Sequence, residues 1–142
     1  MSGERHHTVA TATVTSEEKP YGVRINAGGH ALRGDEPADH GGADTGPAPF
    51  GLLLSGLGAC TAITLRMYAE RKNWPLSGVD VTLTYVVEDR DTRWIDRFIS
   101  VQGVDDDQRA KLAEIAEKTP VTKAVRAGTE IRTTVTGLSQ AP

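Results

Sequence analysis

The sequence predicts an α+β fold in which antiparallel sheets wrap around one long central helix. A single apolar stretch, residues 50–72, spans several helical turns, and stretches with the two-residue periodicity of strands lie before and after it. The strands are grouped around two helices, and such an order favours antiparallel sheets. Because 142 residues is the length of one domain, we expect a single domain over residues 1–142, with flexible tails at 1–7 and 137–142.

Three short strands and a loop are expected before the central helix. Thr8–Thr15 alternates small and β-branched residues, as a half-buried strand does. Tyr21–Ile25 and His30–Arg33 flank the turn sequence Asn-Ala-Gly-Gly, which predicts a hairpin. Gly34–Pro49 is rich in Gly, Pro and Asp and has no apolar period. It is therefore expected to be a long loop, and loops of this length are often functional.

The central helix is expected over Phe50–Lys72. It is apolar nearly all round for four turns, which predicts a place in the interior, and Pro75 follows its charged last turn. Gly56 and Gly58, just before Cys60, each lower the helix propensity by about 1 kcal/mol. We therefore expect a neighbouring element or a ligand to pack closely at these glycines.

The rest of the chain predicts a long hairpin, a second helix and a last strand. Asp105 and Gln108 have the spacing of a capping box, which begins the second helix, and Pro120 follows its end. The strands are expected at Val79–Val87, Trp94–Val101 and Thr129–Thr136, with a short helical turn at Val121–Arg126 that Gly128 closes.

Composition and charge argue against several classes of partner. The net charge of −3 and the scattered Lys and Arg residues offer no basic surface for nucleic acid. Ser, Gly and Thr interrupt the longest apolar segment, Leu52–Leu65, so no membrane span is expected, and Met1–His7 lacks the apolar run of a secretory signal. A single cysteine cannot form an internal disulfide, which agrees with a reducing compartment. We expect a cytoplasmic protein.

Cys60 is the candidate catalytic residue, because the thiolate is the best nucleophile among side chains and a helix fixes its direction. The competing interpretation is an unreactive cysteine, since free cysteines are often small core residues. No metal site is predicted, because the histidines lack ligand spacing and the loop carboxylates lack the spacing of a calcium loop. No cofactor is predicted either, since nucleotide-binding and serine-hydrolase motifs do not occur. The histidines are His6, His7, His30 and His40, and the carboxylates are Asp35, Glu36, Asp39 and Asp44.

The stretch from His30 to Leu76 contains the blocks DEP, GGADTGP and LGACTAITLRMYAERKNWPL. These blocks closely resemble the OsmC/Ohr family of osmotically inducible and organic hydroperoxide resistance proteins, in its OsmC-like branch, and the resemblance continues at lower strength to about Thr134. The resemblance implies an intertwined α+β homodimer. It also implies a thiol-dependent peroxidase for oxidative stress defence, which reduces organic hydroperoxides or hydrogen peroxide through the helix cysteine, here Cys60.

The chain departs from the pattern of this family at two places. The family's second, resolving cysteine lies in a Cys-Pro motif after the second helix, where this chain has Thr119 followed by proline. The family's peroxidases carry a glutamate nine or ten residues before the first cysteine, where this chain has Gly51 and Phe50. The arginine that this glutamate holds over the thiolate would come from between the first two strands, where the chain offers Lys19 and Arg24.

These observations leave several functions open. In the first, a one-cysteine peroxidase, Cys60 attacks the peroxide, becomes a sulfenic acid and is reduced by an external thiol or dithiol. In the second, a binding protein without turnover holds a small hydrophobic ligand in an apolar cavity around Gly56, Gly58 and Cys60. A redox sensor or a purely structural member of the family is the third. Steady-state loss of hydroperoxide with a supplied dithiol separates the first two.

Overall fold

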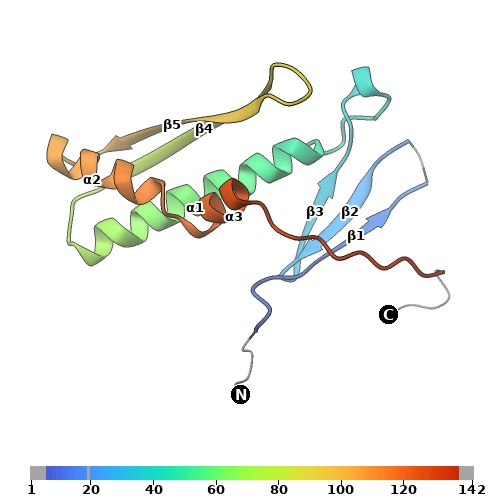
Figure 1. The fold of residues 1–142 in the computed structure, drawn as a ribbon, viewed down its shortest axis with the longest axis horizontal. Helices are drawn as coiled ribbons and strands as arrows, with labels where there is room; N and C mark the ends of the chain where they lie inside the picture. The colour runs from blue at the N-terminus through green and yellow to red at the C-terminus, as the bar shows by residue number, and fades with distance from the viewer. Residues whose placement is uncertain (1–5, 19, 138–142) are drawn as a thin grey trace. The chain divides into compact units, whose positions relative to one another are not determined.

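The computed structural model describes residues 6–18 and 20–137 (Figure 1). The protein is α+β, with antiparallel sheets and one long helix, as the sequence predicts. Its chain divides into two compact units, one formed by the residues up to Gly56 with Leu83–Asp96, the other by Leu57–Thr82 with the residues from Arg97 onward. The outer parts of the two predicted tails, 1–5 and 138–142, lie outside the described residues.

The first unit contains a three-stranded antiparallel sheet. Val14, Ile25 and Leu32 lie side by side across it. The predicted hairpin is confirmed: Gly28 and Gly29 turn the chain with positive φ angles of 59° and 83°. The predicted first strand is also present, although it begins later than expected. In chain order, the strands are β1 (Ala12–Ser16), β2 (Val23–Ala27) and β3 (His30–Gly34).

The predicted loop is held together by the carboxylate of Asp35, which is only 4% exposed. This carboxylate accepts hydrogen bonds from the Thr45 hydroxyl at 2.6 Å, the Thr45 N–H at 3.1 Å and the Glu36 N–H at 2.7 Å. Arg33 donates to the same hydroxyl at 3.0 Å and to both carboxylate oxygens of Glu17. Residues of the blocks DEP and GGADTGP therefore bind each other across the loop. A short 3-10 helix, η1 (Ala38–His40), lies between the two blocks.

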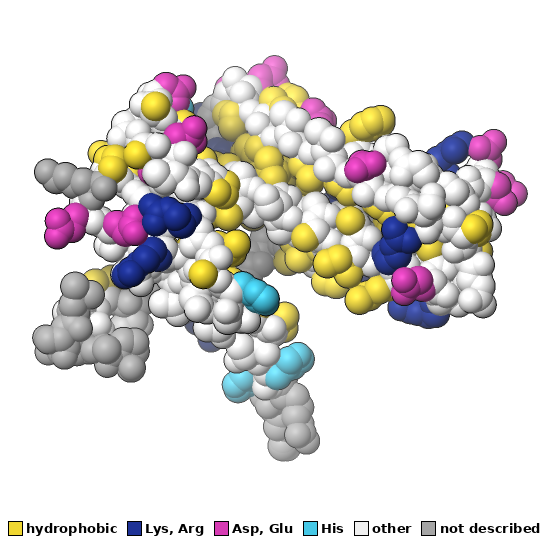
Figure 2. Space-filling view, turned by 180° about the vertical axis from the view of Figure 1, so that it is seen from behind, with side chains coloured by type: hydrophobic (Ala, Val, Ile, Leu, Met, Phe, Trp, Pro, Cys, Tyr) yellow, Lys and Arg dark blue, Asp and Glu magenta, His cyan; other side chains and the backbone are white. Residues whose placement is uncertain are grey.

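The long helix α1 (Pro49–Arg71) matches the predicted central helix. Its buried residues form one stripe at four-residue spacing: Leu57, Thr61, Leu65 and Ala69. Other apolar side chains of the helix remain exposed, among them Ile63 at 53% and Met67 at 54%, and Figure 2 shows that apolar side chains also lie on the molecular surface. The expectation that this helix is enclosed all round is not met within one chain, because the described elements cover only one of its faces.

The close packing expected at the helix glycines is not found at Gly56, where a Cβ atom would meet nothing within 4 Å. Gly34, at the end of β3, is closely packed against the start of this helix. A Cβ atom there would lie 3.1 Å from the Val23 side chain and 3.3 Å from that of Leu52. The glycine therefore lets the first turn of α1 approach the sheet.

The later elements follow the sequence prediction. The strands β4 and β5 pair as a hairpin, with Ser77 N–H donating to Gln102 O at one end and Glu88 N–H donating to Thr92 O at the other. The predicted capping box is confirmed by reciprocal bonds between Asp105 and Gln108. These elements are β4 (Gly78–Val87), β5 (Arg93–Gln102), α2 (Asp106–Ala116) and α3 (Pro120–Ala127).

The second unit has the larger buried core, in which α2 packs against the second half of α1. Leu65 is fully buried, and Ala69, Leu112 and Ala116 are each 1% exposed. Leu76, in the segment that leaves the helix, joins this cluster, and its carbonyl oxygen accepts a hydrogen bond from Arg66 at 2.7 Å. The core thus fixes the part of α1 that carries the cysteine.

The prediction of a last strand at Thr129–Thr136 is wrong for the single chain. All of these residues are described, and they form no regular secondary structure. Ile131 and Val135 are 85% and 88% exposed. Their alternation is that of a strand, but a strand also needs a neighbouring edge for its backbone, and none of the described strands pairs with this segment.

By length and composition alone, α1 is the one helix within the described residues that could cross a bilayer. The core helix of a soluble protein meets the same criterion. This helix also carries Arg66, Glu70 and Arg71 in its last two turns. It therefore does not indicate a membrane protein.

The carboxylate of Asp35 should make stability depend on pH. Hydrogen bonds from the Thr45 hydroxyl, and then from backbone N–H groups, hold the pKa of Asp35 below its ordinary value. Because the folded-state pKa is lowered, the stabilisation is present above the unfolded-state pKa, about 3.9, and is lost as the pH falls through the folded-state value. We expect Asp35→Asn to lower the melting temperature at neutral pH and to weaken its fall in acid, as measured by circular dichroism. Asp39→Asn is the matched control, and parallel acid profiles of wild type and Asp35→Asn would contradict this role.

Candidate active site

Cys60 lies in the middle of α1, next to the buried Thr61, and its own side chain is partly exposed. Its Sγ atom is 3.4 Å from the backbone nitrogen of Val121, which donates to it, and 4.0 Å from the hydroxyl of Thr64. The unreactive interpretation expects a cysteine that is fully buried in the core. Cys60 is instead partly exposed. One backbone N–H is directed at its sulfur.

The N–H that faces the sulfur belongs to the first turn of α3. Pro120 occupies the first position of this helix and has no N–H group, and Thr119, at the N-cap, makes no side-chain capping bond. Val121 N–H has no partner within the helix, and it donates to Cys60 Sγ. Such N–H groups carry partial positive charge, and this one is directed at the sulfur.

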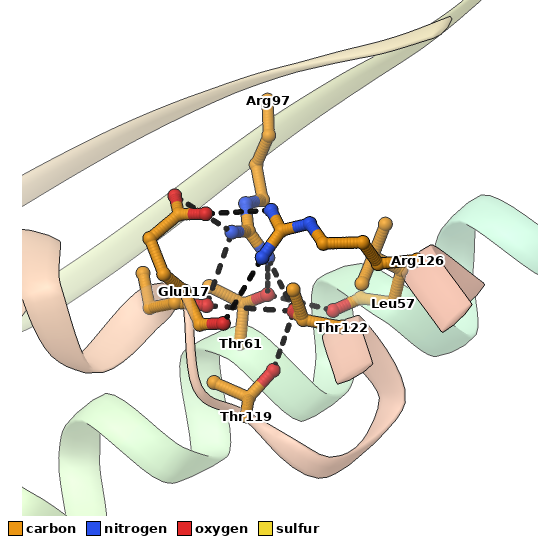
Figure 3. Close-up of polar contacts among 8 residues, drawn as sticks. Leu57, Thr61, Arg97, Glu117, Thr119, Thr122 and Arg126 are labelled. Atoms are coloured by element: carbon orange, nitrogen blue, oxygen red, sulfur yellow. Dashed lines mark hydrogen bonds and ion pairs between the residues drawn. The ribbon is translucent and has the colours of Figure 1, made fainter. Parts of the chain in front are cut away.

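The guanidinium of Arg97 on β5 lies at the centre of a cluster of polar contacts where α2 ends and α3 begins (Figure 3). The side chain is 11% exposed. Its Nη1 donates to Thr61 Oγ1 at 3.0 Å and to Thr122 Oγ1 at 2.7 Å, and its Nη2 donates to the carbonyl oxygen of Ala116 at 3.0 Å. Arg97 therefore joins α1, the end of α2 and the start of α3.

The hydroxyl groups around Arg97 are also paired with one another or with the backbone. Thr119 is fully buried, and its Oγ1 lies 2.6 Å from that of Thr122. Thr61 donates to the carbonyl oxygen of Leu57 at 2.8 Å. Within the described residues, no buried side-chain nitrogen or oxygen atom lacks a partner. The polar side chains of this cluster therefore satisfy one another within the fold.

Glu117 forms the outer edge of this cluster. Its carboxylate accepts from Arg126 at 2.6 Å and from Arg97 at 3.5 Å. The hydrogen bond from Arg126 is the main cause that lowers the pKa of Glu117, and the positive charges of Arg126 and Arg97 add to it. The carboxylate is therefore ionised at neutral pH and partly balances the buried guanidinium.

The positions of the family's glutamate hold no acid. Phe50 packs against Tyr85, with ring centroids 4.6 Å apart, and the carbonyl oxygen of Gly51 accepts a hydrogen bond from Ser55. Of the two candidate cations, Lys19 lies outside the described residues, and Arg24 is exposed on β2 in the first unit. The arginine that the structure ties to the helix of the cysteine is Arg97.

Arg97, Glu117, Thr61 and Thr122 were not predicted from the sequence. One signal for Arg97 was available: it shares the inward-facing positions of β5 with Ile95, Ile99 and Val101, where a charge is unusual. The threonines carry no comparable signal. Within residues 6–18 and 20–137, no group of three or more metal-ligating side chains gathers.

Comparisons with known proteins match the sequence to one family and the fold to solved structures. Residues 41–134 match the family model of the OsmC-like proteins. The fold resembles an OsmC-like protein from Mycoplasma pneumoniae, with a TM-score of 0.68 and 16% identity over 95% of this chain and 92% of that one. The fold also resembles an organic hydroperoxide resistance protein OsmC from Legionella pneumophila, with a TM-score of 0.63 and 17% identity over 86% of this chain and 92% of that one. For the organic hydroperoxide resistance protein OhrB of Bacillus subtilis the TM-score is 0.60, with 20% identity over 84% of this chain and 91% of that one. A comparison with curated protein sequences gives no match.

The family match and the fold thus define an α+β protein of the OsmC/Ohr type. The family model covers well over half of the sequence, and the chain belongs to the OsmC-like family. At 10–20% identity, the likeness to solved structures shows the shared fold, and activity has to be argued from the site itself.

The corner between α2 and α3 allows a direct test of the missing second thiol. Val121, two residues after Thr119, already contacts Cys60 Sγ at 3.4 Å. We expect Thr119→Cys to form an internal disulfide with Cys60 under mild oxidation, which requires the two Cα atoms to lie within about 4.4–6.8 Å. Mass spectrometry after alkylation should then find both thiols blocked. Thr119→Ser is the control, and two free thiols after oxidation of Thr119→Cys would contradict the expected proximity.

Proposed function

We propose that this protein is a one-cysteine thiol peroxidase that reduces organic hydroperoxides or hydrogen peroxide through Cys60. The observation that carries this proposal is the contact of Cys60 Sγ with the N-terminal N–H of α3 at Val121, 3.4 Å away, on a cysteine that is not fully buried. A helix N-terminus favours the thiolate, which is the reactive form of cysteine. The names of the Legionella and Bacillus relatives support hydroperoxides as the substrate class.

In the proposed reaction, the thiolate of Cys60 attacks the terminal oxygen of a hydroperoxide. A sulfur–oxygen bond forms while the oxygen–oxygen bond breaks, and the alkoxide leaves and takes a proton to become an alcohol. The product on the protein is a sulfenic acid. An external thiol then attacks this sulfur, water leaves, and a second thiol releases the reduced cysteine from the mixed disulfide.

The reductant must come from outside the chain. Thr119, at the position of the family's resolving cysteine, has a hydroxyl that binds Thr122 and cannot form a disulfide. The chain has one cysteine, so its sulfenic acid has no thiol partner within the same chain. We therefore propose a small thiol or a dithiol protein as the second substrate, and the cytoplasm, where such thiols are kept reduced, as the compartment.

A binding function without turnover is the second candidate. An open hollow of about 420 Å³ lies over the second half of α1 and is lined mainly by apolar side chains, together with Arg66 and Glu70. Its lining does not include Gly56, Gly58 or Cys60, around which the sequence predicted an apolar cavity. A small hydrophobic ligand in this hollow would leave the thiol free. Its binding would therefore not depend on Cys60.

We further propose that the chain is one domain and acts as an intertwined homodimer. The exposed apolar side chains Ile63 and Met67 on α1, and the unpaired alternating segment 129–136, support a second copy, because they offer area and backbone groups that one chain leaves uncovered. The family to which the chain belongs supports the same assembly.

The catalytic proposal predicts the result of one substitution. Cys60→Ser should reduce steady-state hydroperoxide consumption with a supplied dithiol to the uncatalysed rate, because the hydroxyl is a far weaker nucleophile toward peroxide than the thiolate. The unfolding free energy should change by no more than about 1 kcal/mol, since the two side chains are close in size. Ser55→Ala, which changes an exposed residue of the same helix, is the control. Equal turnover by wild type and Cys60→Ser would refute the role of the cysteine.

The assembly proposal predicts two chains in solution. Sedimentation velocity at micromolar concentration should give the mass of a dimer, and Ile63→Glu with Met67→Glu should shift the protein toward monomer by placing charge on the exposed face of α1. Glu70→Gln on the same helix should leave the mass unchanged. A stable monomer of the wild-type protein would contradict the assembly.

A further inference from the structure

We propose that Arg97 is a positioning residue that holds the N-terminus of α3 on the sulfur of Cys60, a role that rests on the proposed function of that sulfur. The guanidinium does not itself take part in the reaction in this proposal. It acts through two threonines, each of which is the direct chain neighbour of one partner of the sulfur contact: Thr61 follows Cys60, and Thr122 follows Val121.

One guanidinium nitrogen of Arg97 binds both sides of the sulfur contact. Nη1 of Arg97 donates to Thr61 Oγ1 at 3.0 Å and to Thr122 Oγ1 at 2.7 Å. A single atom thus joins the cysteine's turn of α1 to the first turn of α3. These hydrogen bonds are charge-assisted, and such bonds are stronger than those between neutral groups. The sulfur contact lies one residue away on each side and is held by the same link.

The other guanidinium nitrogen of Arg97 binds the end of α2. Nη2 donates to the carbonyl oxygen of Ala116 at 3.0 Å, at the end of α2. Carbonyl groups at a helix C-terminus carry partial negative charge and lack partners within the helix. Because the guanidinium is planar and rigid, its two nitrogens fix the three helices in one geometry that a lysine, with one flexible ammonium group, would not reproduce.

The α3 donor is available to the sulfur because the hydroxyl of Thr119 has another partner. A threonine at an N-cap ordinarily uses its hydroxyl to accept an N–H of the first turn. Here the hydroxyl of Thr119 instead lies 2.6 Å from that of Thr122, which Arg97 binds. Thr119 makes no capping bond, and Val121 N–H is left to the sulfur. The Arg97 cluster therefore determines both the place of the helix and the direction of its free donor.

The test uses the hydroxyl that connects the two ends. Thr122→Val keeps the shape of the side chain and removes the bond to Arg97, whereas Thr122→Ser keeps the hydroxyl. The readouts are the rate of Cys60 alkylation by iodoacetamide as a function of pH, and the hydrogen exchange of the Val121 amide. We expect Thr122→Val to slow alkylation at neutral pH by about 3- to 10-fold, as the loss of one hydrogen bond implies, and to speed Val121 exchange by a similar factor. Thr122→Ser should restore both, and Arg97→Lys should resemble Thr122→Val.

The matched control is Arg126→Met, which removes a guanidinium from the same corner. Arg126 is exposed and, among the described residues, binds Glu117 alone, so alkylation should stay at the wild-type rate. Unchanged alkylation and exchange in folded Thr122→Val would overturn the positioning role. Neither readout uses a peroxide, so a wild type that fails to consume hydroperoxide, while Thr122→Val still slows alkylation, contradicts the proposed function and supports the role of Arg97.

Discussion

Arg97 is a charged side chain that is only 11% exposed, and its hydrogen bonds link three helices of the second unit. A buried guanidinium is tolerated only when its donors are paired, because an unpaired buried charge is strongly destabilising. Here the partners are hydroxyl and carbonyl groups of three helices, with Glu117 balancing the charge at the surface. The requirement to pair one cation thus limits how α1, α2 and α3 can be arranged around Cys60.

This constraint bears on how the protein could work without a second thiol. The resolving cysteine that the family resemblance implies would stand at Thr119, and in this chain that residue belongs to a hydrogen-bonded cluster. Hydrogen bonds hold this segment and the helix of the cysteine together, with no need for oxidation. A sulfenic acid at Cys60 would then remain partly exposed and available to an external thiol, which agrees with the proposed use of a separate reductant.

Local patterns predicted most of the fold, and contacts between distant residues could not be predicted in the same way. The capping box of Asp105 and Gln108 and the glycine turn of the first hairpin are fixed by residues a few positions apart, and both were identified in the sequence. Arg97 binds Thr61, 36 positions away, and no local pattern pairs them. The segment 129–136 has the alternation of a strand, but a strand depends on a partner edge as well, which the single chain does not provide. Cys60 was identified in the sequence, whereas its contact with Val121 required the structure.

The proposed function requires that the sulfur of Cys60 reacts with peroxide. The most direct measurement treats the reduced protein with one equivalent of an alkyl hydroperoxide in the presence of dimedone and locates the adduct by peptide mass spectrometry. We expect one dimedone adduct per chain, on Cys60, and a mixed disulfide in its place when glutathione is added instead. Recovery of Cys60 as the free thiol after this treatment would contradict the peroxidase mechanism and would favour the binding function.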